Sequence, residues 1–147
     1  MCIRDRISPE GEAAISSALS RTQSDVFKSR RFDSLSGGEQ ARVLLARALT
    51  VQAPVLLADE PIAALDPFYQ LSMMEILKAE AASGKTVITA LHDLSLAAQF
   101  ADRIWMMHEG KIIASGTPEE ALNAENLKRV FGIKLPKGGF RPLELAP

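Results

Sequence analysis

The sequence predicts an α/β fold in which parallel strands are flanked by helices and followed by a C-terminal hairpin. Two continuous apolar runs, at 55–58 and 86–91, have the pattern of strands buried on both faces of a parallel sheet. Helical patterns precede, separate and follow these runs, and this alternation is typical of layered α/β folds. With 147 residues, of which 47% are hydrophobic and 24% charged, the chain is long enough for one domain with a packed core.

The first third of the chain is expected to be helical. Residues 1–8 show no periodicity and carry no assignment, and a non-native start is one interpretation of them. Residues 9–19 place small and apolar residues at helical spacing. Ser36 and Glu39 form a capping box that opens a second helix, which is expected to end near Thr50. Its predicted apolar face is Ala41, Leu44, Leu45 and Ala48, with Arg42 and Arg47 off that face.

Further capping signals divide the rest of the chain. Asp66 and Pro67 have the pattern of an N-cap and a first-turn proline, and their helix should reach the turn at 83–84. Residues 94–100 predict another helix. Residues 104–107 and 111–114 flank a turn that reads as a hairpin with Gly110 at positive φ. A capping box at 117–120 opens a short helix, residues 126–131 predict one more helix, and 132–147 should be an irregular tail.

Composition limits the possible function classes. The net charge of −1 offers no global field to attract nucleic acid. No apolar run approaches the roughly 18 residues that a membrane helix needs, and the start is followed by no apolar segment of a secretory signal. The one cysteine excludes an internal disulfide and forms no metal cluster. We therefore expect a cytoplasmic protein.

The start of the 37–50 helix is a candidate anion site. Ser36, Gly37 and Gly38 present a hydroxyl, backbone N–H groups and the positive end of the helix dipole. Two glycines would let a phosphate approach the backbone closely. A capped helix without a ligand is the alternative interpretation, because capping boxes are common.

Polar residues also follow both predicted strands, where open α/β sheets bind their ligands. Asp59 could hold Mg²⁺ through water, and Glu60 could orient or deprotonate an attacking water. Pro61 is expected to keep Glu60 extended. His92 could donate to a phosphate or position water. A strand that ends in a polar turn, and a histidine with a purely structural hydrogen bond, are the alternatives.

Gly84-Lys85-Thr86 matches the end of a phosphate-binding P-loop but has the wrong context. The first glycine of that pattern would be at position 79, which is Ala79. A P-loop also follows a strand and opens a helix, whereas here a helix precedes and a strand follows. The sequence holds no other Gly-Lys-Ser/Thr, so no P-loop is expected in this chain.

In order and spacing, four segments resemble the motifs of ABC-type ATPases. LSGGEQ at 35–40 resembles the signature motif, LLADEP at 56–61 Walker B, ALD at 64–66 the D-loop and LHD at 91–93 the H-loop. The stretch 109–120 resembles the transporter branch, in particular the ATPases of importers for iron-siderophore, haem and vitamin B12. The resemblance implies the C-terminal part of a P-loop NTPase with a RecA-like ABC core. Residues 9–50 would be a partial helical subdomain, and 51–131 the second half of the core.

The resemblance also implies roles for single residues. Glu60 would be the general base, Asp59 would hold Mg²⁺ through water, and His92 would contact the γ-phosphate of ATP. The family works as a head-to-tail dimer, so the signature residues would contact ATP bound to a second ATPase subunit, and Asp66 would cross that interface. Transmembrane permease subunits would be the other partners, at the cytoplasmic face of the membrane, with no nucleic acid. The residues assigned to ATP are Ser36, Gly37, Gly38, Glu39, Gln40 and Asp66.

Departures from the family pattern shape the prediction. The P-loop, the aromatic that stacks on adenine and the glutamine loop precede the signature motif in this family, and none is found before Leu35. Ala64 stands where the D-loop usually has serine. We therefore predict the C-terminal portion of an importer ATPase subunit that hydrolyses no ATP alone and is prone to aggregate.

Two other functions stay open at this point. One is a non-transport ABC ATPase of DNA repair or translation, which the 109–120 stretch and the absence of coiled-coil heptads or basic patches disfavour. The other is an inactive binding module that supplies only the signature face to a complete partner. The presence of both Glu60 and His92 disfavours that module.

Overall fold

The computed structural model describes residues 7–134 and 138–140 of the 147-residue chain. The chain forms two compact units, Met1–Thr89 and Ala90–Pro147, which are described separately below. The division falls inside the predicted 51–131 segment. Among the described residues, no helix combines the length and apolar character needed to cross a membrane.

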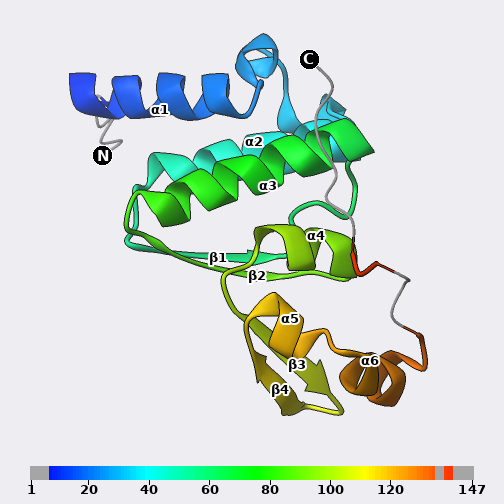
Figure 1. Cartoon of the computed structure of the whole chain (residues 1–147). Coiled ribbons are helices and arrows are strands. Elements are labelled where there is room, and N and C mark those ends of the chain that lie inside the picture. Colours follow the sequence, from blue (N-terminus) through cyan, green and yellow to red (C-terminus); the bar gives the residue numbers. More distant parts are fainter. Residues whose placement is uncertain (1–6, 135–137, 141–147) are drawn as a thin grey trace. The chain divides into compact units, whose positions relative to one another are not determined.

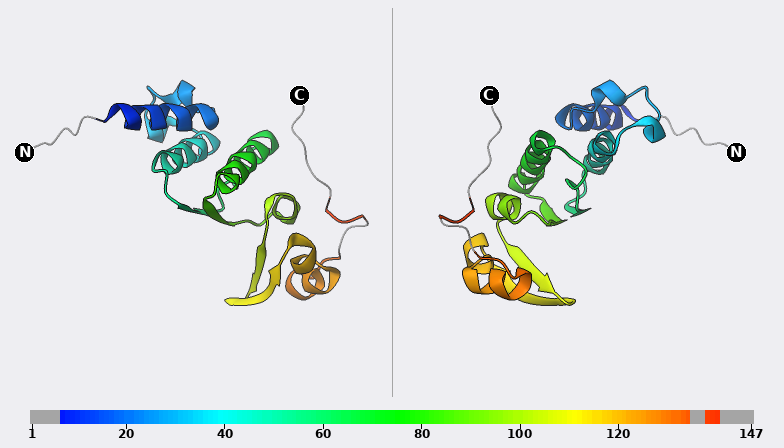
Figure 2. Two further views of the ribbon diagram at one scale, coloured as in Figure 1. Left: turned by 60° about the vertical axis from the view of Figure 1, so that its left-hand side comes forward. Right: turned by 90° about the vertical axis from the view of Figure 1, so that its right-hand side faces the viewer.

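The first unit has helices on one side of a pair of strands. Strands β1 and β2 pair in parallel, with helix α3 as the crossover between them, and α2 and α3 lie on the same side of the pair (Figures 1 and 2). The predicted strand–helix–strand unit is therefore confirmed. Its elements are α1 (Pro9–Arg21), η1 (Asp25–Phe27), η2 (Phe32–Ser34), α2 (Gly37–Thr50), β1 (Val55–Asp59), α3 (Pro67–Ala82) and β2 (Thr86–Ala90).

Local capping chemistry explains where these helices begin. The capping box of α2 forms as predicted, because the Ser36 N–H donates to Glu39 Oε2 at 2.8 Å and the Glu39 N–H donates to Ser36 Oγ at 3.4 Å. Asp66 caps α3, since its Oδ1 accepts the Tyr69 N–H at 3.1 Å, and Pro67 fills the first turn. Both starts follow directly from the sequence.

The two strands are not buried on both faces, so that prediction is wrong for this chain. Residues Val55, Leu57 and Ile88 are 49%, 71% and 40% exposed. Alternate residues of a strand point to opposite faces, and α2 and α3 cover only one face of the pair. The other face is apolar and accessible in the part of the chain that the structure describes.

The predicted apolar face of α2 is also partly wrong. Leu44 was expected to pack inward but is 49% exposed, whereas Arg42, expected off the apolar face, is only 7% exposed. Helix α1 and the turn that follows it pack against α2 and cover Arg42, which changes which stripe of α2 is interior. The packed core on α2 and α3 consists of Leu45, Ala46, Leu49, Leu71, Met73, Met74 and Leu77.

Over its described residues, the second unit combines a hairpin with three short helices. Helix α4 (Leu94–Phe100) precedes β3 (Ile104–His108) and β4 (Lys111–Gly116), followed by α5 (Pro118–Ala121) and α6 (Ala124–Phe131). The predicted hairpin is confirmed: β3 and β4 pair antiparallel, and Glu109 and Gly110 both have positive φ, 47° and 73°, in the turn. The predicted capping box of Thr117 also forms.

A small apolar core holds the second unit together. Met106, Leu122 and Leu127 are buried at 4%, 4% and 0% exposure. The side chains of Leu94, Ile104 and Val130 are among the partly buried residues that pack on them. The expected irregular tail falls largely on residues 135–137 and 141–147, which lie outside the described residues.

Candidate functional site

A groove in the first unit lies between the starts of α2 and α3. Its volume is about 340 Å³. One wall comes from the predicted signature motif and the other from the predicted D-loop, so two segments distant in sequence share one site. Lining it are Ser36, Gly38, Glu39, Arg42, Ala64, Leu65, Asp66 and Tyr69.

Glu39 has its carboxylate committed to the capping box. The hydrogen bond from the Ser36 backbone N–H lowers the pKa of Glu39, and the Arg30 cation, whose Nη1 lies 3.6 Å from Glu39 Oε1, acts in the same direction. The carboxylate is therefore ionised at neutral pH and holds the start of α2. Its geometry supports a structural role at the edge of the groove.

Gln40 and Gly37, also assigned to ATP by the resemblance, are not among the groove-lining residues. The Gln40 side-chain amide turns back to donate to the carbonyls of Phe32 at 3.2 Å and Leu35 at 3.1 Å. It therefore fixes the loop that leads into α2, rather than facing the groove.

Gly38 allows the two walls to approach closely. A Cβ at this position would lie 3.2 Å from the Ala64 carbonyl oxygen and 3.4 Å from Leu65 Cδ2. At Gly37 the nearest atom, Ala64 Cβ, would be 3.7 Å away, which is ordinary contact. Of the two glycines, only Gly38 lies where a Cβ would make an unusually tight contact with the 64–66 segment.

Asp59 and Glu60 lie at the end of β1, exposed and outside the groove lining. Glu60 is not extended as predicted, because its φ is +45°. Proline disfavours the right-handed helical region for the preceding residue, and the chain here turns through the left-handed region instead. Such a conformation is uncommon outside glycine and is frequent at functional sites.

The exposed carboxylates fit a Mg²⁺ held through water. Among the described residues, no group of three His, Cys, Asp or Glu could hold a metal ion on its own. Mg²⁺ commonly uses one or two carboxylates and takes its remaining ligands from water and phosphate oxygens. Asp59 could therefore supply a protein ligand for an ion that arrives with a nucleotide.

His92 belongs to the second unit, where it is exposed just after β2. Asp93 caps α4, since its Oδ1 accepts the N–H groups of Ser95 at 2.8 Å and Leu96 at 2.9 Å. Of the predicted site residues, the structure brings together Ser36, Gly38, Glu39 and Asp66.

Besides Tyr69, Arg42 is a polar groove residue that was not predicted from the sequence. Its guanidinium carbon lies 4.0 Å from the ring centroid of Tyr69 and 5.0 Å from that of Phe27. A signal was available, because an arginine in the second turn after a capped helix start lies near that start. What covers the arginine is a tertiary contact, and helical periodicity does not show it.

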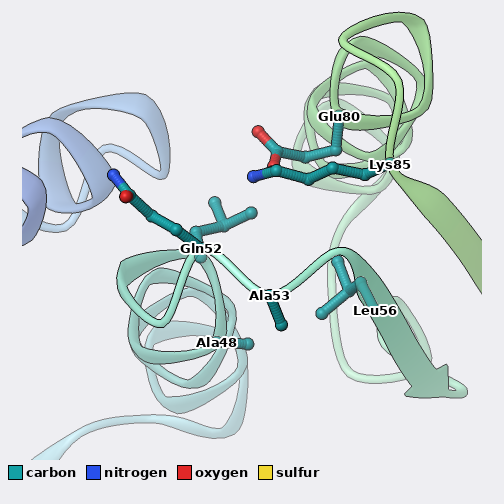
Figure 3. Close-up of a pocket in the computed structure, with 7 residues that line it drawn as sticks. Ala48, Gln52, Ala53, Leu56, Glu80 and Lys85 are labelled. Atoms are coloured by element: carbon teal, nitrogen blue, oxygen red, sulfur yellow. The ribbon is translucent and has the colours of Figure 1, made fainter.

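A second polar cluster joins α1, α3 and the start of β2. Glu80 Oε1 lies 2.6 Å from Arg21 Nη2, and Glu80 Oε2 lies 2.5 Å from Lys85 Nζ. Figure 3 shows the Glu80 and Lys85 side chains pointing toward one another. Both residues line a small cavity of about 10 Å³. Burial raises the pKa of Glu80, but the hydrogen bonds from Lys85 and Arg21 outweigh it, so the net pKa is lowered.

The first unit has the strand–helix–strand pattern of an α/β protein, and similarity to solved ATP-binding cassettes assigns it to part of a P-loop NTPase fold. The family model described as "ABC transporter" matches residues 3–63. The hemin import ATP-binding protein HmuV of Streptomyces coelicolor is 45% identical over 122 residues, covering 83% of this chain and 44% of that protein. The petrobactin import ATP-binding protein FpuC of Bacillus anthracis is 40% identical over 133 residues, covering 90% of this chain and 49% of that protein. The chain thus spans a little under half the length of these relatives.

A solved structure agrees with these matches. The chain is similar, at 32% identity and a TM-score of 0.70, to a dimeric ATP-binding cassette in a post-hydrolysis state bound to ADP and Pi, over 79% of this chain and 51% of that one. The chain belongs to the family of ABC-type ATPases, in agreement with the motifs read from its sequence.

Proposed function

We propose that this chain carries the signature, Walker B, D-loop and H-loop segments of the ATP-hydrolysing subunit of an importer. The observation that carries the proposal is the groove, where the capped start of α2 faces the segment around Asp66. The first turn of a helix offers unpaired N–H groups and a positive dipole end, which suit a phosphate. In this proposal, Ser36 and Gly38 contact ATP held by a second subunit.

The remaining roles belong to the carboxylates and the histidine. Glu60 acts as the general base for water attack, Asp59 holds Mg²⁺ through water, and His92 reaches the γ-phosphate. The assembled ATPase works at the cytoplasmic face of the membrane with permease subunits. Haem, iron-siderophore or vitamin B12 is the proposed cargo, and relatives named for hemin and petrobactin import support that choice.

The first test measures the chain alone. Mg-ATP is titrated into the purified 147-residue chain and into its Glu60→Gln variant, and ATP turnover is followed in parallel. We expect neither saturable binding at millimolar ATP nor turnover, because the 147-residue sequence holds no P-loop motif, whose lysine and backbone N–H groups bind the β- and γ-phosphates. Turnover by the chain alone that depends on Glu60 would contradict the proposal that hydrolysis needs a P-loop from outside this chain.

The second test asks whether the groove works as a signature face. A complete importer ATPase subunit whose own signature serine has been replaced is mixed with this chain in Mg-ATP. We expect at least a tenfold gain in turnover with the wild-type chain and none with Ser36→Arg, because the arginine would fill the groove. Ser34→Arg, on an exposed neighbouring residue, is the matched control and should preserve the gain. No gain with the wild-type chain would contradict the proposal.

The same mixture distinguishes the inactive binding module. Both functions predict that Glu60→Gln leaves the gain intact, because the composite site would use the partner's own Walker B carboxylate. Only the ATPase function predicts a further gain, dependent on Glu60, when the chain is joined to a P-loop-bearing segment. The inactive binding module stays a second candidate function, because the groove that it would offer to a partner is present in the described first unit.

A further inference from the structure

Arg42 is buried in a way that packing alone does not explain. The residue is 7% exposed, and its Nε is the only buried side-chain nitrogen or oxygen without a hydrogen-bond partner in the part of the chain that the structure describes. Leaving a buried donor unmet is unfavourable, and an apolar side chain could fill the same space without that cost. The presence of an arginine here is therefore better explained by the segments that its guanidinium group holds in place.

The guanidinium contacts three segments of the first unit. It lies over the ring of Tyr69 in the first turn of α3 and over the ring of Phe27 in η1. Its Nη1 also donates to the backbone carbonyl of Gln23 at 3.1 Å. A planar, delocalised cation can stack on aromatic rings and donate in its own plane at once, which lysine cannot do.

These contacts connect the two walls of the groove. Arg42 lies in the second turn of α2, whose start is capped by Ser36. Tyr69, under the guanidinium, donates its backbone N–H to Asp66 on the opposite wall. We propose that Arg42 is a positioning residue that sets the spacing between Ser36 and Asp66. The functional meaning of that spacing rests on the proposed ATPase function.

The same cation also holds a strained turn at the end of α1. Gln23 has a φ of +52°, a conformation uncommon for a residue other than glycine. Its carbonyl is the one that Arg42 binds, and Thr22 and Ser24 close the turn, with Thr22 Oγ1 donating to Ala18 O at 3.0 Å. The position of the α1 end is thereby linked to the groove through one side chain.

The decisive test needs no nucleotide. Backbone amide exchange is measured on the whole chain for the wild type and for Arg42→Met. The matched control is Arg47→Met, because Arg47 is an exposed arginine on the same helix. We expect the amides of Tyr69 and Ser24 to exchange at least tenfold faster in Arg42→Met only. Tyr69 is the single tyrosine, so a change of its ring NMR signals in Arg42→Met alone gives an independent signature. Uniform acceleration over the first unit, or no change at Tyr69, would overturn the proposal.

Arg42→Lys separates the contact with Tyr69 from the contact with the Gln23 carbonyl. It also tests the positioning role if Arg42→Met does not fold. Lysine keeps the charge over a ring but cannot reach the Gln23 carbonyl at the same time. We expect fast exchange at Ser24, as in Arg42→Met, with wild-type protection at Tyr69. Equal changes at both amides would show that Arg42 does not link two separate contacts.

The mixed ATPase assay then measures the functional consequence. With the signature-defective partner subunit, Arg42→Met should lower kcat at least tenfold with KM for ATP within about twofold, since the spacing acts on the closed site. Arg47→Met should match wild type. If wild-type chain gives no gain, the proposed function fails while the exchange data still decide the positioning role. A wild-type gain that Arg42→Met preserves would overturn the positioning role alone.

Discussion

Replacing Glu80 by glutamine removes the buried carboxylate from a three-residue ion cluster with Arg21 and Lys85. The Glu80 side chain is 7% exposed, whereas those of Arg21 and Lys85 are 38% and 26% exposed. Breaking a fully buried pair costs about 3–5 kcal/mol, and breaking an exposed pair costs about 0–1 kcal/mol. The two cations here keep part of their hydration, so we expect Glu80→Gln to lower the free energy of unfolding by about 2 kcal/mol.

The effect should depend on pH with a defined sign. The pKa of Glu80 is lowered in the folded chain from its ordinary value of 4.5. Its contribution is therefore fully present above that value and is lost as the pH falls through the lower, folded pKa. The difference in unfolding free energy between wild type and Glu80→Gln should be largest at neutral pH and shrink steadily below pH 4.5.

Urea unfolding followed by far-UV circular dichroism measures this difference at neutral and acidic pH, at low protein concentration. Glu75→Gln is the matched control, because Glu75 is an exposed glutamate on the same helix, and it should change stability by less than about 0.5 kcal/mol. A Glu80→Gln effect no larger than that of the control would refute the reasoning. An effect of equal size at both pH values would refute it too.

Three further predictions concern the groove, the open strand face and the second unit. Gly38→Ala should destabilise the first unit and lower turnover in the mixed ATPase assay relative to Gly37→Ala, because only at Gly38 would a Cβ press on the Ala64 carbonyl; equal behaviour of the two variants would contradict this. Leu57→Lys should reduce aggregation in light scattering while changing stability by less than about 0.5 kcal/mol, because Leu57 is 71% exposed; unchanged scattering would count against the strand face as the source. Asp93→Ala should destabilise the second unit by about 1–2 kcal/mol in thermal unfolding, since two N–H groups lose their acceptor, and a neutral effect would contradict that role.

Local sequence signals determined where most elements begin and which family the chain belongs to. Ser36, Asp66, Asp93 and Thr117 each cap the helix that was predicted after them. Capping depends on hydrogen bonds between residues a few positions apart, so a short stretch of sequence specifies it. The hairpin turn at Gly110 follows for the same reason, because positive φ is a property of single residues.

The tertiary structure decided what is buried and which residues share a site. Arg42 was expected off the apolar face, and only the packing of α1, Phe27 and Tyr69 around it makes it interior. Val55 and Leu57 have the apolar character of buried strand residues, yet no element of the described first unit covers their face. Burial and the groove depend on contacts between distant segments, and hydrophobic periodicity records only which side chains favour burial, not which partners are present.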